Sequence, residues 1–116
     1  MDINDYQKQA EKTDTFNDTI PVANLTTPGF VEKALGLSGE AGEVADKIKK
    51  IIRDKNGKLT KEDRQEIILE LGDVLWYLAN ISRVLGIPLE EVAVKNLKKL
   101  AARQKNHTIH GSGDHR

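Results

Sequence analysis

The chain has 116 residues, among them 18 Lys plus Arg, 18 Asp plus Glu and no cysteine. This length fits one domain with one core, and zero formal net charge provides no overall field that would attract nucleic acid or an anionic membrane. The absence of cysteine excludes disulfides, thiolate metal sites and a cysteine nucleophile. No apolar run is long enough to span a bilayer, so we expect a cytoplasmic protein without membrane or nucleic-acid partners.

A short first helix is predicted over residues 3–16, where Ile3, Tyr6 and Ala10 recur at helical spacing. A polar loop follows, and Pro28 suits the first turn of the next helix because its φ is already helical. The second helix is predicted over residues 28–52, where apolar residues follow one face at steps of three and four: Leu37, Ala41, Val44, Ile48 and Ile51.

Thr60, with Asp63 three residues later, predicts the start of a third helix, which continues to about residue 85 and stops at Gly86. Pro88 then opens a fourth helix, with acids in its first turn and bases near its end. The tail, residues 106–116, has no period and is predicted to be irregular, which leaves residues 1–105 as the domain.

The predicted fold class is therefore all-α: a short N-terminal helix plus three longer helices in a bundle that self-association completes. The low aromatic content of 4% requires an aliphatic core. We expect this core to contain Leu35, Leu37, Val44, Ile48, Leu71, Val74, Leu78, Ile81, Val92 and Leu97.

Two pairs of acids mark the second and third helices: Glu40 with Glu43, and Glu70 with Asp73. Residues three apart are neighbours on a helix surface, so each pair can present adjacent carboxylates. The helical wheel places Glu40 and Glu70 nearest the apolar faces and turns Glu43 and Asp73 outward. Four carboxylates held together repel one another unless a hard cation such as Mg²⁺ joins them.

Spacing alone does not establish a metal site, because other acids in the chain also lie three residues apart and could form an ordinary solvated face. Glycines surround these two pairs, at Gly36, Gly39 and Gly42 and again at Gly72. Each glycine costs a helix about 0.5–1 kcal/mol relative to alanine. We therefore expect close approach of a neighbouring group at these positions.

Two segments resemble one known family, the MazG-like nucleoside triphosphate pyrophosphohydrolases: GLSGEAGEVAD at residues 36–46 and ELGDVLWYL at residues 70–78. The resemblance covers roughly residues 1–103 and implies an all-α fold, a homodimer or homotetramer, and magnesium, for which Mn²⁺ is expected to substitute. The residues that match the family's metal ligands are Glu40, Glu43, Glu70 and Asp73.

The resemblance also implies polar and basic groups that reach the phosphates, at Asn96, Lys99 and Arg103. Lys99 and Arg103 share one helical face, although a solvated helix end would have the same pattern. Trp76, the only tryptophan, is a candidate for stacking on the nucleobase or for burial at a subunit contact.

The expected function is Mg²⁺-dependent hydrolysis of a nucleoside triphosphate to the monophosphate and pyrophosphate, in the service of nucleotide-pool housecleaning. Glu43 is the expected general base, because a carboxylate not fully engaged with metal can accept a proton from water. Two alternatives are open. One is a related pyrophosphohydrolase restricted to dUTP, dCTP or phosphoribosyl-ATP, and the other is a non-catalytic helical adaptor that pairs through its apolar faces.

Overall fold

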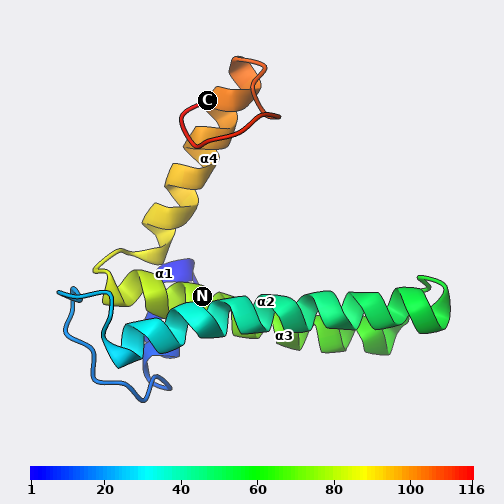
Figure 1. Ribbon diagram of the computed structural model, residues 1–116, viewed down its shortest axis with the longest axis horizontal. Helices are drawn as coiled ribbons and strands as arrows, with labels where there is room; N and C mark the ends of the chain where they lie inside the picture. The colour runs from blue at the N-terminus through cyan, green and yellow to red at the C-terminus, as the bar shows by residue number, and fades with distance from the viewer.

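The computed structural model describes residues 1–116 and contains four helices and no strand (Figure 1). Helices α2 and α3 form a long antiparallel hairpin, α1 packs across α3 near the open end of that hairpin, and α4 projects away from it. The bounds are α1, Ile3–Glu11; α2, Pro28–Lys55; α3, Lys61–Val84; and α4, Leu89–Lys105. This confirms the predicted all-α fold class.

The helix starts agree with prediction to within a residue, whereas two of the ends differ. Helix α1 stops at Glu11, because the residues that follow form a turn and their polar side chains bond to the chain nearby. Helix α2 continues to Lys55 and ends at Asn56, which adopts a left-handed conformation with a φ of 52°. None of the four helices combines the length and apolar character needed to cross a membrane.

A capping box starts α3 and closes the hairpin. The Thr60 hydroxyl accepts a hydrogen bond from the Asp63 backbone N–H at 3.1 Å, and the Asp63 carboxylate accepts one from the Thr60 N–H at 3.0 Å. Lys55, the last residue of α2, donates to the same carboxylate at 2.7 Å. The short connection is thus held from both sides, which sets the register of α2 against α3.

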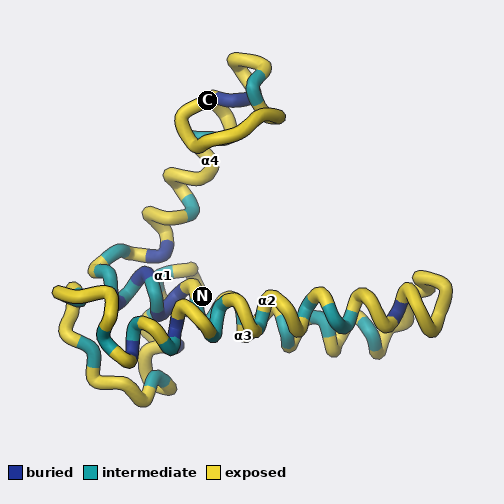
Figure 2. The backbone as a smooth tube through the Cα atoms, in the orientation of Figure 1, coloured by how far each residue is buried: buried dark blue, intermediate teal, exposed yellow.

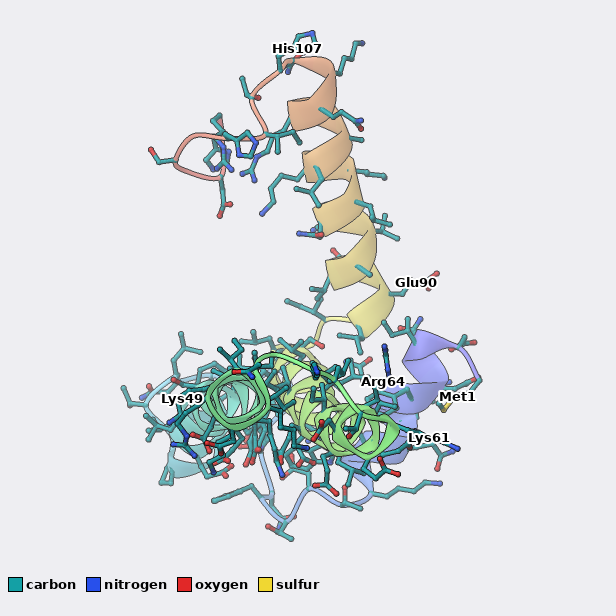
Figure 3. All side chains as sticks on the ribbon, turned by 90° about the vertical axis from the view of Figure 1, so that its right-hand side faces the viewer. Met1, Lys49, Lys61, Arg64, Glu90 and His107 are labelled. Carbon is teal, nitrogen blue, oxygen red and sulfur yellow. The ribbon has the colours of Figure 1, made fainter.

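Gln7 of α1 joins three elements at the base of α4. Its side-chain amide donates to the Ala79 carbonyl, the Ser82 hydroxyl and the Ile87 carbonyl at 2.9–3.1 Å. Its carbonyl oxygen accepts from the Leu89 N–H at 3.2 Å. Only the first turn of α4 is held in this way, and the rest of the helix extends away from the other three, as Figure 3 shows from Glu90 to His107.

The predicted core is wrong for the single chain. None of its ten members is buried, and Leu35 and Leu97 are 68% and 66% exposed. Two helices side by side shield only their line of contact, so the predicted apolar residues remain partly open to solvent. The apolar side chains that are buried are Ala10, Ile51, Ala79, Val84 and Leu89, most of them where α1, α3 and α4 meet (Figure 2).

The shape is extended for a chain of this size. The radius of gyration is 17.0 Å, whereas a compact domain of 116 residues is expected near about 13 Å. The accessible surface is 8359 Å², against about 6300 Å² for a typical folded monomer of this mass. The apolar surfaces of α2, α3 and α4 therefore remain largely uncovered in one chain.

Candidate metal centre

Three of the four predicted ligands meet on one side of the α2–α3 hairpin. Each of Glu40, Glu70 and Asp73 offers a carboxylate oxygen, and these three oxygens lie within 4.8 Å of one another. Antiparallel packing explains why: as residue numbers rise along α2 they fall along α3, so Glu40 lies opposite Asp73, with Glu70 one turn along α3. An all-oxygen set of this kind suits a hard divalent cation.

Glu43 is not part of this three-carboxylate cluster. Its side chain is exposed, as is that of Asp73, whereas Glu40 and Glu70 are half-buried. This distribution is the one that the helical wheel predicts. Glu43 therefore lies one turn along α2 from the cluster, at its solvent side.

Mutual repulsion shows in the electrostatics of the cluster. Burial, followed by the charges of Asp73, Glu70 and Glu43, raises the pKa of Glu40 above its ordinary value. Lys47 relieves part of the charge, because its ammonium lies 3.6 Å from Glu70 and 3.1 Å from Glu66. These ion pairs in turn raise the pKa of Lys47, with the Glu66 hydrogen bond as the largest cause.

A recess of about 430 Å³ opens beside the cluster, with Glu40 and Asp73 in its wall. Its other lining residues are Thr13, Trp76 and Tyr77. The two aromatic rings meet edge to face, with centroids 4.9 Å apart and an interplanar angle of 82°. The recess thus combines carboxylate oxygens with an aromatic wall, a composition that suits a ligand with one charged and one planar part.

Thr13 and Tyr77 line the recess but were not predicted from the sequence. Tyr77 packs against Gly36 so closely that a Cβ at this glycine would lie 2.2 Å from the ring, and its hydroxyl donates to Glu32 at 3.1 Å. The predicted close approach is therefore confirmed at Gly36, and this glycine was the available signal for Tyr77. Thr13 carried no comparable signal, because it comes to the recess from a loop.

The other three glycines behave differently. A Cβ at Gly39, Gly42 or Gly72 would meet nothing within 4 Å, so the expectation of close approach there is wrong within a single chain. The α2–α3 contact does not run along these positions. Their backbone is therefore uncovered in one chain, and each lies next to a predicted ligand in the sequence.

The predicted phosphate-binding residues lie elsewhere. Helix α4 packs against α1 and α3 but not against α2, so one chain does not bring Asn96, Lys99 and Arg103 to the acidic cluster. Lys99 donates to Asp114 of the tail at 3.0 Å, and Arg103 donates to the same carboxylate at 3.3 Å. Asn96 and Lys99 also line a separate groove of about 370 Å³.

Residues 32–108 match a known family, described as the MazG nucleotide pyrophosphohydrolase domain. The match covers about two thirds of the chain, including both acidic pairs and all of α3. This chain belongs to that family. This confirms the resemblance predicted from the two acidic segments, residues 36–46 and 70–78.

One relative matches over the full length of both chains. It is the Gene 37 protein of Mycobacterium phage L5, which is 40% identical over 116 residues. Its name does not state an activity. No solved structure is significantly similar to this chain.

Proposed function

We propose that this protein hydrolyses nucleoside triphosphates between the α- and β-phosphates in a magnesium-dependent reaction, releasing a nucleoside monophosphate and pyrophosphate. The observation that carries the proposal is the cluster of Glu40, Glu70 and Asp73 in and beside a recess with an aromatic wall. Membership of the MazG nucleotide pyrophosphohydrolase family supports the same reaction class. Removal of damaged or unwanted nucleotides is the corresponding biological role.

The cluster fits magnesium on its chemistry. All three donors are carboxylate oxygens. Burial first, and then the charges of the neighbouring acids, raise the pKa of Glu40, and a bound cation would offset that repulsion. When bound, Mg²⁺ would neutralise phosphate charge and act as a Lewis acid at the reacting phosphorus. We assign Glu40, Glu70 and Asp73 as its ligands, with Glu43 as a fourth, and Mn²⁺ as an effective substitute.

Glu43 is also the proposed general base. It is exposed, one turn from Glu40 and outside the three-carboxylate cluster. Its carboxylate would therefore be the one not fully engaged with the metal, and would accept a proton from the attacking water. The water oxygen forms a bond to the α-phosphorus while the bond to the bridging oxygen breaks, and pyrophosphate leaves. Trp76 is proposed to contact the nucleoside, because it forms part of the recess wall beside Asp73.

We further propose that the functional unit is a homodimer or a homotetramer. About 2000 Å² of accessible surface exceeds that expected of a compact monomer of this mass. The uncovered backbone at Gly39, Gly42 and Gly72 leaves room for close packing by a second copy. In such an assembly Asn96, Lys99 and Arg103 of one chain would reach the phosphates bound on another.

A panel of common and modified nucleoside triphosphates tests the proposal. With magnesium present we expect release of pyrophosphate, not orthophosphate, and no turnover after chelation. Hydrolysis confined to dUTP, dCTP or phosphoribosyl-ATP would identify the narrow-substrate alternative. Absence of turnover, together with no calorimetric binding of a nucleotide at millimolar magnesium, would favour a helical adaptor and overturn the proposal.

A further inference from the structure

A buried group of four charges lies beside the recess but outside the metal centre. Lys33 of α2 is fully buried, and the side chains of Asp14 and Asp18 are 3% and 4% exposed. The Lys33 ammonium lies 3.0 Å from an Asp14 oxygen and 2.7 Å from an Asp18 oxygen, and Arg83 of α3 pairs with Asp14. Two cations thus balance two carboxylates, as burial of charge requires. We call these residues the Lys33 network.

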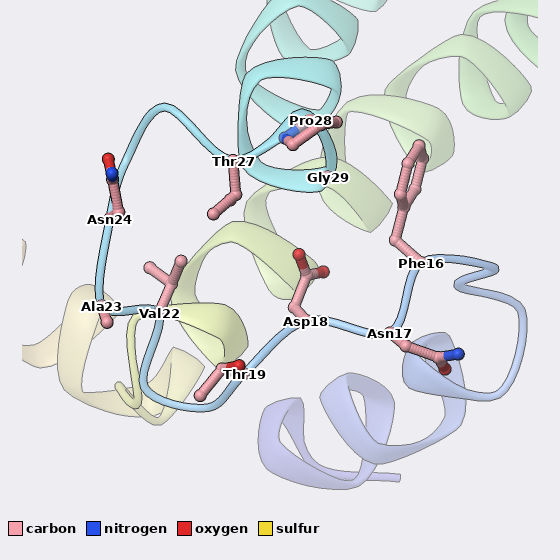
Figure 4. Close-up of a pocket in the computed structure, with 10 residues that line it drawn as sticks. All are labelled: Phe16, Asn17, Asp18, Thr19, Val22, Ala23, Asn24, Thr27, Pro28 and Gly29. Carbon is pink, nitrogen blue, oxygen red and sulfur yellow. The ribbon is translucent and has the colours of Figure 1, made fainter.

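The Lys33 network attaches the loop between α1 and α2 to the hairpin. Figure 4 shows Phe16 and Asp18 of this loop beside the first turn of α2. The Lys33 ammonium lies 5.0 Å from the centroid of the Phe16 ring, a cation–π contact. At Gly29 a Cβ would lie 2.4 Å from an Asp18 oxygen, so the loop packs directly on the α2 backbone.

Two hydrogen bonds connect the network to Trp76. Thr13, the residue before Asp14, accepts a hydrogen bond from the indole N–H at 2.8 Å. On the other side, the amide of the buried Asn80 donates to the Trp76 carbonyl at 3.3 Å and accepts from Arg83 at 3.0 Å. Thr13 also donates its hydroxyl to the Ala10 carbonyl at 3.0 Å. The indole N–H is therefore bonded to the residue beside Asp14, and the Trp76 carbonyl to a residue that Arg83 contacts.

We propose that the Lys33 network is a positioning device that holds the Thr13 hydroxyl against the indole N–H and so orients Trp76 in the recess wall. Lys33 does not line the recess and acts through Thr13. The inference rests on the proposed function for its substrate, the nucleoside part of the triphosphate.

A consequence for specificity follows from the same hydrogen bond. Because Thr13 occupies the indole N–H, Trp76 presents its ring to the substrate without a free donor. A ring contact accepts any base with a π-face, so Trp76 contributes affinity for the nucleoside without distinguishing bases by their hydrogen-bonding groups.

The decisive variant is Thr13→Val, which changes the shape little but removes the hydroxyl that accepts from the indole N–H and donates to the Ala10 carbonyl. Trp76 is the only tryptophan, so its fluorescence anisotropy, acrylamide quenching and near-ultraviolet circular dichroism report on the indole directly. We expect lower anisotropy and easier quenching in the nucleotide-free protein. With substrate, KM should rise roughly three- to tenfold while kcat changes less than about twofold, because a misoriented ring weakens nucleoside binding.

Two controls separate positioning from general damage. Thr15→Val makes the same chemical change two residues away at an exposed position and should leave both the spectra and KM unchanged. Thr13→Ser retains the hydroxyl, so its Trp76 spectra and its KM should be close to those of the wild type. Unchanged Trp76 spectra in Thr13→Val would overturn the link to Thr13, and altered spectra with an unchanged KM would overturn its role in substrate binding.

Lys33→Met tests the network itself. It leaves two carboxylates against Arg83 alone, and should change Trp76 in the same direction as Thr13→Val. Adding Asp18→Asn restores charge balance. The Trp76 spectra and KM of this double variant should return part of the way to their wild-type values. If the single and double variants show equal changes in the Trp76 spectra and in KM, positioning by charge pairing is contradicted. The spectra need no nucleotide, so they distinguish failure of this inference from failure of the proposed activity.

Discussion

The acidic hairpin and the basic end of α4 were predicted from the same resemblance, yet only the hairpin assembles its residues within one chain. Glu40, Glu70 and Asp73 converge from two helices to within 4.8 Å. Lys99 and Arg103 instead contact Asp114 of the chain's own tail. A resemblance to one family thus predicted two groups of residues that lie apart in the single chain.

The hairpin and α4 differ in how each is attached to the rest of the chain. A short, capped connection joins α2 to α3, and ion pairs such as that of Lys47 with Glu70 follow along the hairpin. Helix α4 is anchored only at its start, through Gln7 and through Asn4 with Glu90. Local geometry can therefore set the register of the hairpin, whereas within one chain no contact holds the end of α4 near the acidic cluster.

Substitutions in the acidic cluster of the hairpin should cause the largest loss of activity. Glu40→Gln or Asp73→Asn should reduce magnesium-dependent pyrophosphate release by roughly 100-fold or more, because bound metal contributes several kcal/mol to transition-state stabilisation. Magnesium titration calorimetry and initial rates measure the loss, and far-ultraviolet circular dichroism should remain helical. Glu62→Gln, the same change at an exposed α3 acid outside the cluster, is the matched control. Full turnover in Asp73→Asn would remove that residue from the site.

Mixing variants tests whether the two regions belong to different chains. Asp73→Asn and Lys99→Gln should each be nearly inactive alone, one lacking a metal ligand and the other a phosphate contact. If sites form between subunits of a dimer, an equimolar mixture refolded together should recover up to about a quarter of wild-type activity, because half of the dimers contain one intact site of two. Native mass spectrometry would show whether mixed dimers form. If they form and the mixture recovers no activity, the two regions do not share a site.

Acid should weaken the capped connection that closes the hairpin. Lys55 and Thr60 lower the pKa of Asp63 to about 2, from an ordinary value of 3.8. A lowered folded-state pKa means that this stabilisation is complete above the ordinary value and is lost as pH falls from about 4 toward 2. Urea unfolding across this interval should show a weaker pH dependence for Asp63→Asn than for the wild type. Equal slopes would show that the cap does not contribute.

Substitution of Asp114 in the tail should have the smallest effect on catalysis. Lys99, and then Arg103, lower the pKa of Asp114, but this side chain is 76% exposed, and exposed ion pairs contribute little to stability. Asp114→Asn should release both bases for phosphate and lower KM by about twofold, with kcat unchanged. Steady-state kinetics at low ionic strength measures the shift. A rise in KM would indicate that Asp114 helps to place Lys99 and Arg103 for binding.

Much of the architecture was predictable because its causes are local. Apolar periodicity predicted the four helices, Thr60 with Asp63 predicted a cap, and the glycine-marked acidic pairs predicted the family. Gly36 predicted a close contact, although not its partner, Tyr77. Each of these signals lies within a few residues of the structure it specifies.

Other features depended on segments far apart in the chain. The predicted core failed because periodicity identifies an apolar face without showing what covers it, and two helices leave most of each face open. Likewise, nothing near Lys33 in the sequence indicates that it is buried with Asp14 and Asp18 of a preceding loop.

By itself, the sequence determined the helices, the acidic pairs and the family, because helix periodicity and motif spacing are short-range properties. Only the tertiary structure decided which carboxylates converge, that Thr13 and Tyr77 complete the recess, and that the basic end of α4 lies apart from it. The physical reason is that antiparallel packing and loop closure set distances between residues that no local pattern relates.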